Sequence, residues 1–280
     1  MSTYLSNSLI MVPNTMNTYL SKRNRALLSE LVRTDFKLRY QGSALGYAWS
    51  VLKPLLMFVI LYVVFVYFLR IGKDVEHFPV YLLLGIVMWN FFTEMTIQSL
   101  SSILNRGDLI RKIKIPRWTI VFSSSISAVI NLALSLVVVG IFMIINGVEL
   151  TPYALLFPLN IFMLYILALG VSYFLAAAFV KFRDLNYIWD VVLQAGFYVT
   201  PIIYPITMVP SVTIQQVLLL NPIAMAIQDA RFNLVTQTTV TTESLLSFAW
   251  TIIPIVITIG IFILGITYFK SQSSSFAENI

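Results

Sequence analysis

Six long apolar runs determine what this chain can fold into. They cover residues 52–69, 78–97, 118–145, 154–180, 187–206 and 245–269. An apolar run of about 20 residues can cross the hydrocarbon core of a bilayer, roughly 30 Å thick, as an α-helix. Only helices or closed barrels satisfy their backbone in lipid, and the alternating pattern of barrel strands is absent from the sequence. The sequence therefore predicts an all-α integral membrane protein with six transmembrane helices.

The composition agrees with a chain that lies mostly in lipid. Hydrophobic residues make up 59% of the 280 residues and charged residues 11%, whereas a soluble domain carries about 25% charged residues. We expect a flexible cytoplasmic tail over residues 1–24 and a single transmembrane domain over residues 25–280. Cysteine is absent and His77 is the one histidine, which excludes disulfides and Cys- or His-rich metal sites. No metal or cofactor site is expected in this chain.

The basic residues are distributed unevenly between the two sides of the membrane. Fifteen of the 18 lysines and arginines lie before the first run or at its start, or in the segments after the second, fourth and sixth runs. If each run crosses the membrane once, all these segments lie on the same side. The other three are Arg70, Lys73 and Arg231. Cytoplasmic loops carry an excess of Lys and Arg, so we expect both termini in the cytoplasm, in agreement with an even number of spans. This topology, and not attraction to nucleic acid, accounts for the net charge of +6.

The stretch before the first run has the pattern of an amphipathic helix, expected over residues 25–41. At 100° per residue, one side carries Leu27, Leu28, Leu31, Val32, Phe36 and Leu38, and the other carries Glu30, Arg33, Thr34 and Lys37. Such a helix lies in the membrane interface with its cations toward anionic headgroups. Gly42 and Gly46 permit a sharp turn into the first span. The alternative is an ordinary basic flank that only sets the topology.

Several motifs resemble one family of transport proteins. The stretch "LVRTDFKLRYQGSALGYAWSVLKPL" is similar to the N-terminal signature of permease subunits of polysaccharide-exporting ABC transporters of the ABC-2 type, which handle O-antigen, teichoic acid, capsule or cell-wall rhamnan. The resemblance continues through "LLLGIVMWNFF", "RGDLIRKIKIPR", "FRDL" and "NPIA", in the family's order. It implies a bacterial plasma (inner) membrane subunit that forms a homodimer, pairs with two ABC ATPase subunits and acts on a lipid-linked polysaccharide among membrane lipids.

The loop between the second and third runs predicts a short helix over residues 105–115. Asn105 is expected as its N-cap, Asp108 lies where the helix dipole favours an acid, and Pro116 ends it. The loop either only orients the protein or, as the resemblance implies, is a coupling helix that docks into the ATPase. The residues expected at this contact are Asn105, Arg106, Asp108, Leu109, Ile110, Arg111, Lys112 and Ile113, with a smaller second contact at Arg183 and Asp184.

The chain has no G-x-x-x-x-G-K-[ST] phosphate loop, so it offers no nucleotide cradle of this kind. The resemblance therefore implies a transport subunit that is not itself an enzyme, with ATP and Mg bound by a separate ATPase chain.

Aromatic residues make up 14% of the chain, and aromatic faces can stack on the C–H surfaces of sugars. The candidates for lining a path are Phe58, Tyr62, Phe65, Phe197, Tyr198 and Tyr204. Packing against lipid and interfacial belts is the alternative for each of them. The amphipathic helix would lie beside the entrance to this path, where Arg33, Lys37, Arg39 and Tyr40 could attract the pyrophosphate of a lipid-linked sugar.

The segment between the fifth and sixth runs, residues 207–244, predicts short external re-entrant helices interrupted at Asn221 and Pro222. It is too short to cross the membrane twice. The resemblance implies an external gate, and a simple capping loop is the alternative. Two acids close to the runs, Glu94 and Asp190, are expected as interfacial charges that reach water or pair with loop cations.

These observations favour the membrane subunit of an ATP-driven exporter of a lipid-linked polysaccharide. An ABC-2 exporter of drugs or simple lipids is one alternative. A membrane enzyme acting on lipid-linked sugars is another, and it would need paired acids at one membrane face, whereas Glu94, Asp108, Asp184 and Asp190 are scattered. A passive channel would not need the docking loop.

Overall fold

The computed structural model describes residues 26–34, 46, 48–72, 75–112 and 116–276, and all regular structure in these ranges is helical. A first helix covers residues 26–34. The following elements are α3 (Ala48–Tyr62), η1 (Val63–Phe68), α4 (Phe78–Ser102), η2 (Leu104–Arg106), α5 (Gly107–Lys112), α6 (Trp118–Ile145), η3 (Pro152–Leu156), α7 (Phe157–Lys181), α8 (Leu185–Val199), η4 (Ile206–Met208), α9 (Val212–Leu219), α10 (Pro222–Leu234), α11 (Thr242–Leu245), α12 (Phe248–Gln272) and η5 (Ser273–Ser275).

Five stretches of helix are long and apolar enough to cross a membrane. They are Val51–Phe68, Phe78–Ser102, Trp118–Ile145, Pro152–Lys181 and Trp250–Gln272. Their outward faces carry large aliphatic and aromatic side chains, such as Ile144, Leu155 and Leu264, as a surface in contact with lipid requires. The prediction of an all-α, multi-pass membrane protein is confirmed at this level.

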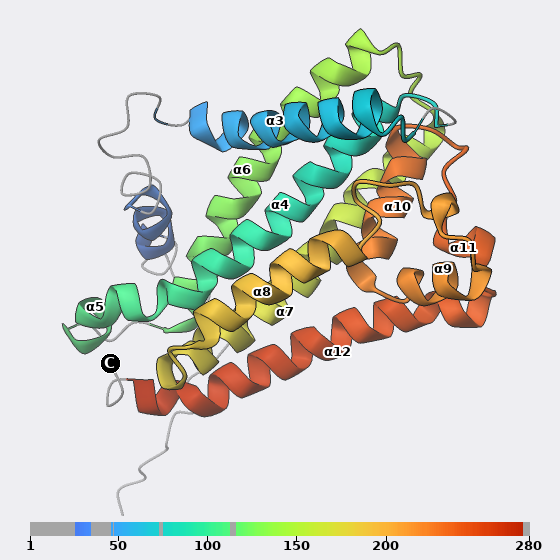
Figure 1. The fold of residues 1–280 in the computed structure, drawn as a ribbon. Coiled ribbons are helices and arrows are strands. Elements are labelled where there is room, and N and C mark those ends of the chain that lie inside the picture. The colour runs from blue at the N-terminus through green and yellow to red at the C-terminus, as the bar shows by residue number, and fades with distance from the viewer. Residues whose placement is uncertain (1–25, 35–45, 47, 73–74, 113–115, 277–280) are drawn as a thin grey trace, which may run out of the picture.

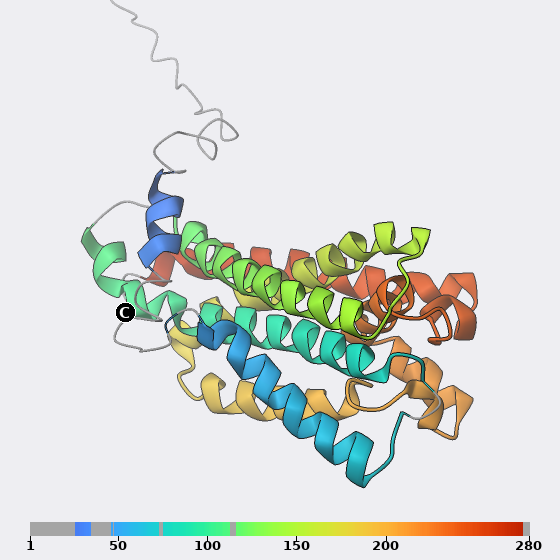
Figure 2. The same cartoon turned by 90° about the horizontal axis from the view of Figure 1, so that it is seen from above.

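Helix α4 is the centre of the bundle. Most of its side chains are buried, because it packs against α3, α6, α7, α8 and α10. Figure 1 shows α4 crossing the molecule diagonally, and Figure 2 shows α3 and α8 on one side of it and α6 on the other. Helix α12 packs along α7, and the two backbones touch where Gly265 faces Gly170. Small residues allow this close approach of two helices in lipid.

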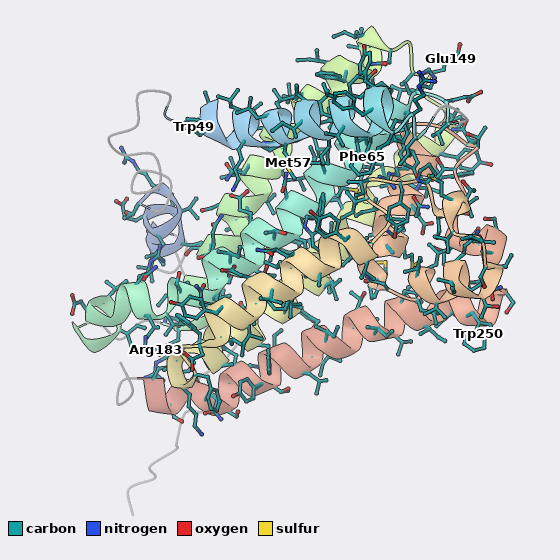
Figure 3. The ribbon with its side chains drawn as sticks, in the orientation of Figure 1. Trp49, Met57, Phe65, Glu149, Arg183 and Trp250 are labelled. Atoms are coloured by element: carbon teal, nitrogen blue, oxygen red, sulfur yellow. The ribbon has the colours of Figure 1, made fainter. Side chains whose placement is uncertain are left out.

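The two ends of the bundle differ in charge. One end, here called the basic end, contains α5, the turn between α7 and α8, and the end of α12, with Arg106, Arg117, Lys181, Arg183 and Lys270. The opposite end contains residues 69–72, 75–77, 146–153 and 200–247. Figure 3 shows Arg183 and Glu149 at these two ends.

The fifth apolar run differs from its prediction. Residues 187–206 were expected as one helix, but α8 ends at Val199 and residues 200–205 are irregular. The prolines at positions 201 and 205 cannot supply the backbone N–H groups that a continuing helix needs. At about 1.5 Å per residue, the 15 residues of α8 span about 22 Å, which is less than the thickness of the hydrocarbon core.

The predicted amphipathic helix is described only in its first part, residues 26–34, where Leu31 is buried and Arg33 is exposed. Lys37, Arg39 and Tyr40 lie outside the described residues. The carbonyl of Leu31 accepts a hydrogen bond from Arg106 Nη2 at 3.4 Å, which attaches this helix to the loop after α4.

Candidate functional sites

The predicted coupling helix begins differently from the expectation. Asn105 is not an N-cap, because residues 103–107 already have helical backbone angles and the chain continues from α4 through η2 into α5. The Asn105 side chain instead donates to Ser101 Oγ at 3.1 Å. Asp108 lies in the first turn of α5, as predicted, and is exposed. Arg111 and Lys112 form the end of α5, and Ile113 lies outside the described residues.

Arg106 points into the protein and not toward a partner. It donates from Nη1 to Ser123 Oγ on α6 at 3.0 Å, in addition to its bond with the carbonyl of Leu31. Ile110 packs against the hydrophobic core, and Leu109 is half-buried. The described part of this loop therefore offers Asn105, Asp108 and part of Leu109 to a partner, while Arg106 holds the loop in place.

The second predicted contact lies at the same end of the molecule. Arg183 and Asp184 are both exposed in the turn between α7 and α8, and the Arg183 guanidinium lies 5.9 Å from the ring centroid of Phe179. Figure 1 shows α5 and this turn at the same end of the bundle. The structure thus brings two loops that are 70 residues apart in the sequence to one surface, here called the loop surface.

The aromatic candidates on α3 and η1 are mostly part of the protein interior. Phe58 is 4% exposed and makes an edge-to-face contact with Phe142 of α6 at 5.3 Å. Tyr62 and Phe65 are half-buried against the core. The exposed aromatic side chains of the described part of this segment are Trp49, Tyr67 and Phe68, which are not among the six candidates.

The candidates near α8 also differ in whether they contact the protein or are exposed. Phe197 packs edge-on against Trp89 of α4 at 6.1 Å. The hydroxyl of Tyr204 donates to the carbonyls of Tyr198 and Val199 at 3.3 and 3.1 Å, where α8 ends. Tyr198 is 66% exposed. The six candidates therefore do not form one exposed row in a single copy of the chain, and their role as path-lining residues remains a prediction.

The most unusual group in the structure is Arg231 on α10, which the sequence analysis counted as an external loop cation. Its side chain is completely buried. It donates to the carbonyls of Tyr81 (3.0 Å), Pro201 (2.6 Å) and Ile202 (2.6 Å), and to Gln228 Oε1 (3.0 Å). The guanidinium also lies 3.7 Å from the centroid of the Tyr81 ring. A buried cation requires such partners, because burial removes its hydration.

Arg231 supplies hydrogen-bond donors to the buried backbone that follows the end of α8. Carbonyls of an irregular segment need hydrogen-bond donors when water is excluded, and Pro201, Ile202 and Ile203 are buried. The five N–H groups of one guanidinium can serve several carbonyls at once. Gly85 of α4 leaves the space for it, because a side chain at that position would overlap Arg231 Nη2. No sequence motif signalled this network, since three of its four hydrogen-bond acceptors are backbone carbonyls.

Glu94 of α4 contacts neighbouring helices. It accepts a hydrogen bond from Gln98 Nε2 at 2.7 Å and another from Asn131 Nδ2 on α6. These amide donors replace part of the hydration that the carboxylate loses. The expected interfacial acid is therefore also a link between α4 and α6.

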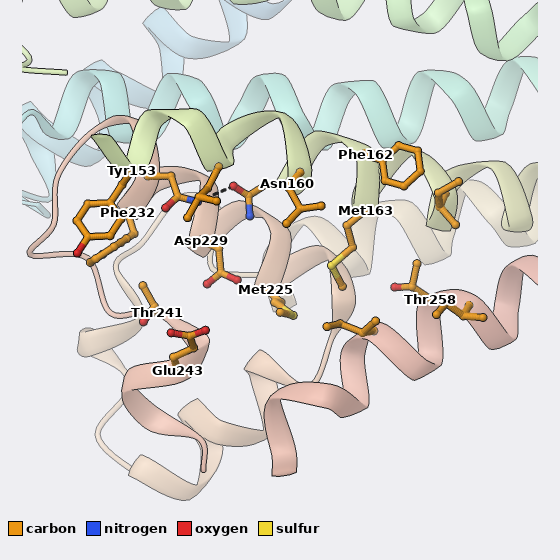
Figure 4. Close-up of a pocket in the computed structure, with 16 residues that line it drawn as sticks. Tyr153, Asn160, Phe162, Met163, Met225, Asp229, Phe232, Thr241, Glu243 and Thr258 are labelled. Carbon is orange, nitrogen blue, oxygen red and sulfur yellow. Dashed lines mark hydrogen bonds between the residues drawn. The ribbon is translucent and has the colours of Figure 1, made fainter. Parts of the chain in front are cut away.

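A cavity of about 590 Å³ at the opposite end is lined by residues from α7, α10 and α12 (Figure 4). Its walls are largely apolar, and Asp229 and Glu243 form its acidic part. Burial raises the pKa of Asp229 to about 6, with a smaller increase from the charge of Glu243, while hydrogen bonds from the backbone and hydroxyl of Thr242 act in the opposite direction. Across the cavity, Asn233 donates to Asn160 Oδ1 at 2.8 Å.

Comparisons with known proteins agree on one family. The family model described as "ABC-2 type transporter" matches residues 26–235. The chain is 31% identical over 199 residues to an O-antigen export system permease protein RfbA of Myxococcus xanthus, which covers 71% of this chain and 76% of that protein. It is 29% identical over 257 residues to a protein of the same name from Klebsiella pneumoniae. That alignment covers 90% of this chain and 94% of the relative.

Proposed function

Because the chain belongs to the ABC-2 type transporter family, we propose that it is the membrane-spanning subunit of an ATP-driven exporter that moves a lipid-linked polysaccharide out of the cytoplasm. The observation that carries this proposal is the likeness to a permease named for O-antigen export, over 90% of this chain. The helical bundle with five long apolar helices agrees with such a subunit. O-antigen is the first substrate to test, and teichoic acid or rhamnan are the related possibilities.

In this proposal the basic end faces the cytoplasm of a bacterial plasma membrane. The exposed cations of the described residues are concentrated there, as the positive-inside rule requires. At the opposite end Arg231 is buried by the protein and is not a loop cation, so Arg70 is the exposed cation among the residues described at that end. Both termini then lie on the cytoplasmic side.

The sixth crossing is provided by α8 together with the irregular residues 200–205. Non-helical backbone is tolerated at membrane depth where protein buries it and supplies donors, and Arg231 supplies donors to residues 201 and 202. Helix α10 packs into the bundle from the outer side, which agrees with its buried residues and its contacts with α4, α7 and α12. We assign residues 207–244 as the external gate on this basis.

The loop surface at the basic end is the docking site for the ATPase. Its exposed Asp108, Arg183 and Asp184 provide charges for pairing, and half-buried Leu109 provides an apolar contact. This combination of a small apolar centre with a charged rim is typical of protein interfaces. The first helix, joined to this end through Arg106, brings Arg33 to the interface beside the substrate's entrance.

The subunit functions as a homodimer in which α3 and α8 face the second copy. These two helices lie on the same side of α4 (Figure 2) and expose a large apolar surface that includes Ile60, Tyr67 and Val191. Gln194 of α8 is exposed on this side, and a polar side chain facing hydrocarbon is unfavourable. A second copy would enclose it in a path between the subunits.

Deletion of the gene tests the proposal directly. A strain without it should lose its surface polysaccharide while intracellular lipid-linked glycan accumulates, and the wild-type gene should restore both. Retention of the surface glycan would contradict the proposal and favour an exporter of drugs or simple lipids.

Charge reversal tests the docking site. Asp108→Lys should reduce co-purification of the ATPase and export, whereas Glu149→Lys, a reversal of another exposed charge at the other end (Figure 3), should leave both unchanged. Equal behaviour of the two variants would remove α5 from the contact.

The absence of native cysteine allows the dimer to be tested by crosslinking. Tyr67→Cys or Tyr198→Cys should give crosslinked dimers in membranes. Leu155→Cys, at an exposed position of η3 directly before α7, should not.

A further inference from the structure

The cavity of about 590 Å³ at the opposite end runs from the surface of the bundle toward its middle. Residues 159–166 of α7 form part of its wall, and at about 1.5 Å per residue they extend over about 10 Å. Asp229 and Glu243 lie at one end of the cavity, whereas Phe162 and Thr258 lie toward the other (Figure 4). The cavity is therefore acidic near the loops of the opposite end and apolar deeper in the bundle.

The deeper part of the cavity is formed by helices that face lipid. Leu159 and Phe162 of α7 line it together with Ile255 and Ile259 of α12, and all four side chains are exposed. Both helices are among those long and apolar enough to cross a membrane. An occupant of this part must therefore be apolar, and the bilayer itself is its nearest source.

Polar side chains in the walls from α7, α10 and α12, other than Asp229, are paired within the protein. Asn233 donates to Asn160 Oδ1 at 2.8 Å, and the Thr258 hydroxyl donates to the carbonyl of Pro254 at 2.8 Å. These groups need no ligand. The polar chemistry that the cavity offers to a ligand is therefore concentrated at its acidic end.

The two carboxylates of the acidic end are accessible. Asp229 is partly exposed and Glu243 is exposed. The backbone and the hydroxyl of Thr242 both donate to Asp229 Oδ1, at 3.3 Å each, so Oδ2 has no hydrogen-bond partner among the described residues. None of the described residues that line the cavity is basic. Burial raises the pKa of Asp229 to about 6, so at neutral pH this carboxylate is ionised without a counter-ion in the cavity wall.

These features specify the ligand by class. An apolar cavity beside the bilayer, with negative charge at the membrane surface, fits a lipid with a cationic headgroup. A primary ammonium brings three N–H donors, and such charge-assisted hydrogen bonds to a carboxylate are strong. A trimethylammonium group has no N–H donor. An anionic headgroup, including the pyrophosphate of a lipid-linked glycan, would be repelled by the two carboxylates.

We propose that this cavity binds a phospholipid with a primary-amine headgroup, such as phosphatidylethanolamine, from the leaflet at the opposite end. Its ammonium lies against Asp229 and Glu243, and an acyl chain occupies the apolar part between α7 and α12. Because Met225, Asp229 and Phe232 of α10 form part of the wall, the bound lipid joins α10 to these two helices. This inference requires only that the chain lies in a bilayer, so it does not depend on the proposed substrate.

Native mass spectrometry of the full-length protein, with the subunits that co-purify with it, tests the proposal. The protein is released from nanodiscs with equal amounts of phosphatidylethanolamine, phosphatidylcholine and phosphatidylglycerol, and the wild type should retain phosphatidylethanolamine preferentially. Asp229→Asn keeps an acceptor for Thr242 but removes the charge, so it should reduce this preference roughly tenfold, for one lost charge-assisted hydrogen bond. Glu149→Gln is the matched control, because it removes an exposed charge at the same end but outside the cavity, and it should change nothing.

Met163→Trp tests the apolar part separately. Met163 of α7 lines the cavity (Figure 4), and a larger side chain there would take the space of the acyl chain while both acids stay in place. This variant should lower the retention of phosphatidylethanolamine about as strongly as Asp229→Asn does.

The pH dependence gives a readout that a purely structural role of Asp229 would not produce. The ionisable side chains among the described lining residues are Asp229, Glu243 of α11 and Tyr153 of η3. Protonation removes the charge of Asp229, so the preference for phosphatidylethanolamine should decrease as the pH falls through about 6. Asp229→Asn should lose most of this dependence.

Two results would overturn the proposal. One is equal retention of the three lipids by the wild type, or the same preference in the wild type, Asp229→Asn and Met163→Trp. The other is binding of dodecylammonium that depends on Asp229 without retention of any of the three lipids, because the cavity would then take a soluble amphipathic cation.

Discussion

Replacing Gly85 by alanine tests whether the position of Arg231 is essential to the fold. A methyl group at Gly85 would overlap Arg231 Nη2 and would lie 3.4 Å from the carbonyl oxygen of Ile202. The guanidinium is fixed by three carbonyls and Gln228, so it cannot move without breaking at least one of these hydrogen bonds. The bond most directly affected is the one from Nη2 to Ile202.

The expected magnitude follows from two opposing terms. Alanine favours a helix over glycine by about 1 kcal/mol, which by itself would stabilise the variant. A hydrogen bond that involves a charged group contributes about 1.5–3 kcal/mol, and its loss leaves a carbonyl of residue 202 without a donor. The net effect of Gly85→Ala is therefore a destabilisation of about 0.5–2 kcal/mol, or a decrease in Tm of roughly 1–8 °C.

Thermal unfolding in nanodiscs, followed by tryptophan fluorescence, measures this change, and hydrogen exchange locates it. Residues 202–206 should exchange faster in Gly85→Ala than in the wild type. Gly140→Ala in α6 is the matched control, since a methyl group there meets no atom within 4 Å, and its stability should be equal or slightly higher. If Gly85→Ala is as stable as Gly140→Ala, the guanidinium can move without cost. Arg231 is then not required to hold the irregular segment that follows α8.

Three further predictions concern other contacts. Gly265→Ala should separate α7 from α12 and lower Tm clearly more than Gly260→Ala on the same helix, because only the former would overlap the backbone oxygen of Gly170. Asn131→Leu should destabilise the protein by about 1–3 kcal/mol, because the Glu94 carboxylate loses a donor. Asp229 binds its proton more tightly in the folded protein than in the unfolded chain, so ionisation of this carboxyl destabilises the fold. The destabilisation is absent below pH 4, increases up to about pH 6 and is complete above it. The free energy of unfolding of Asp229→Asn should therefore match that of the wild type near pH 4 and exceed it above pH 6, by about 1–2 kcal/mol after allowance for partial exposure.

The apolar runs predicted the long helices well, because crossing lipid requires nearly continuous apolar sequence. The failure at residues 187–206 has the same origin. Hydropathy measures how apolar a segment is and does not register whether its backbone is paired, so a run containing Pro201 and Pro205 still resembles a span. The helix ends at Val199 because tertiary contacts replace the missing helical hydrogen bonds.

The candidate sites were predictable only in part. Asp108, Arg183 and Asp184 are exposed at the basic end, as polar residues in short loops usually are, whereas their predicted role as contacts for the ATPase stays a prediction. The burial of Phe58 and the inward direction of Arg106 depend on neighbours from α6, which the sequence does not place. Gln228 gave no signal at all, since its importance comes from which of its two polar atoms Arg231 and Tyr81 occupy.

Arg231 also determines which parts of the molecule can move separately. Its hydrogen bonds join α4 at Tyr81, the segment after α8 at residues 201 and 202, and α10 at Gln228. Moving any of these three elements alone would expose a buried cation or leave buried carbonyls without donors, and both are strongly unfavourable. An opening of the opposite end must therefore move the three elements together, around contacts that lie outside this network. The contacts of α9 with α11 meet that condition, so we expect the first movements of the proposed external gate, residues 207–244, to occur there.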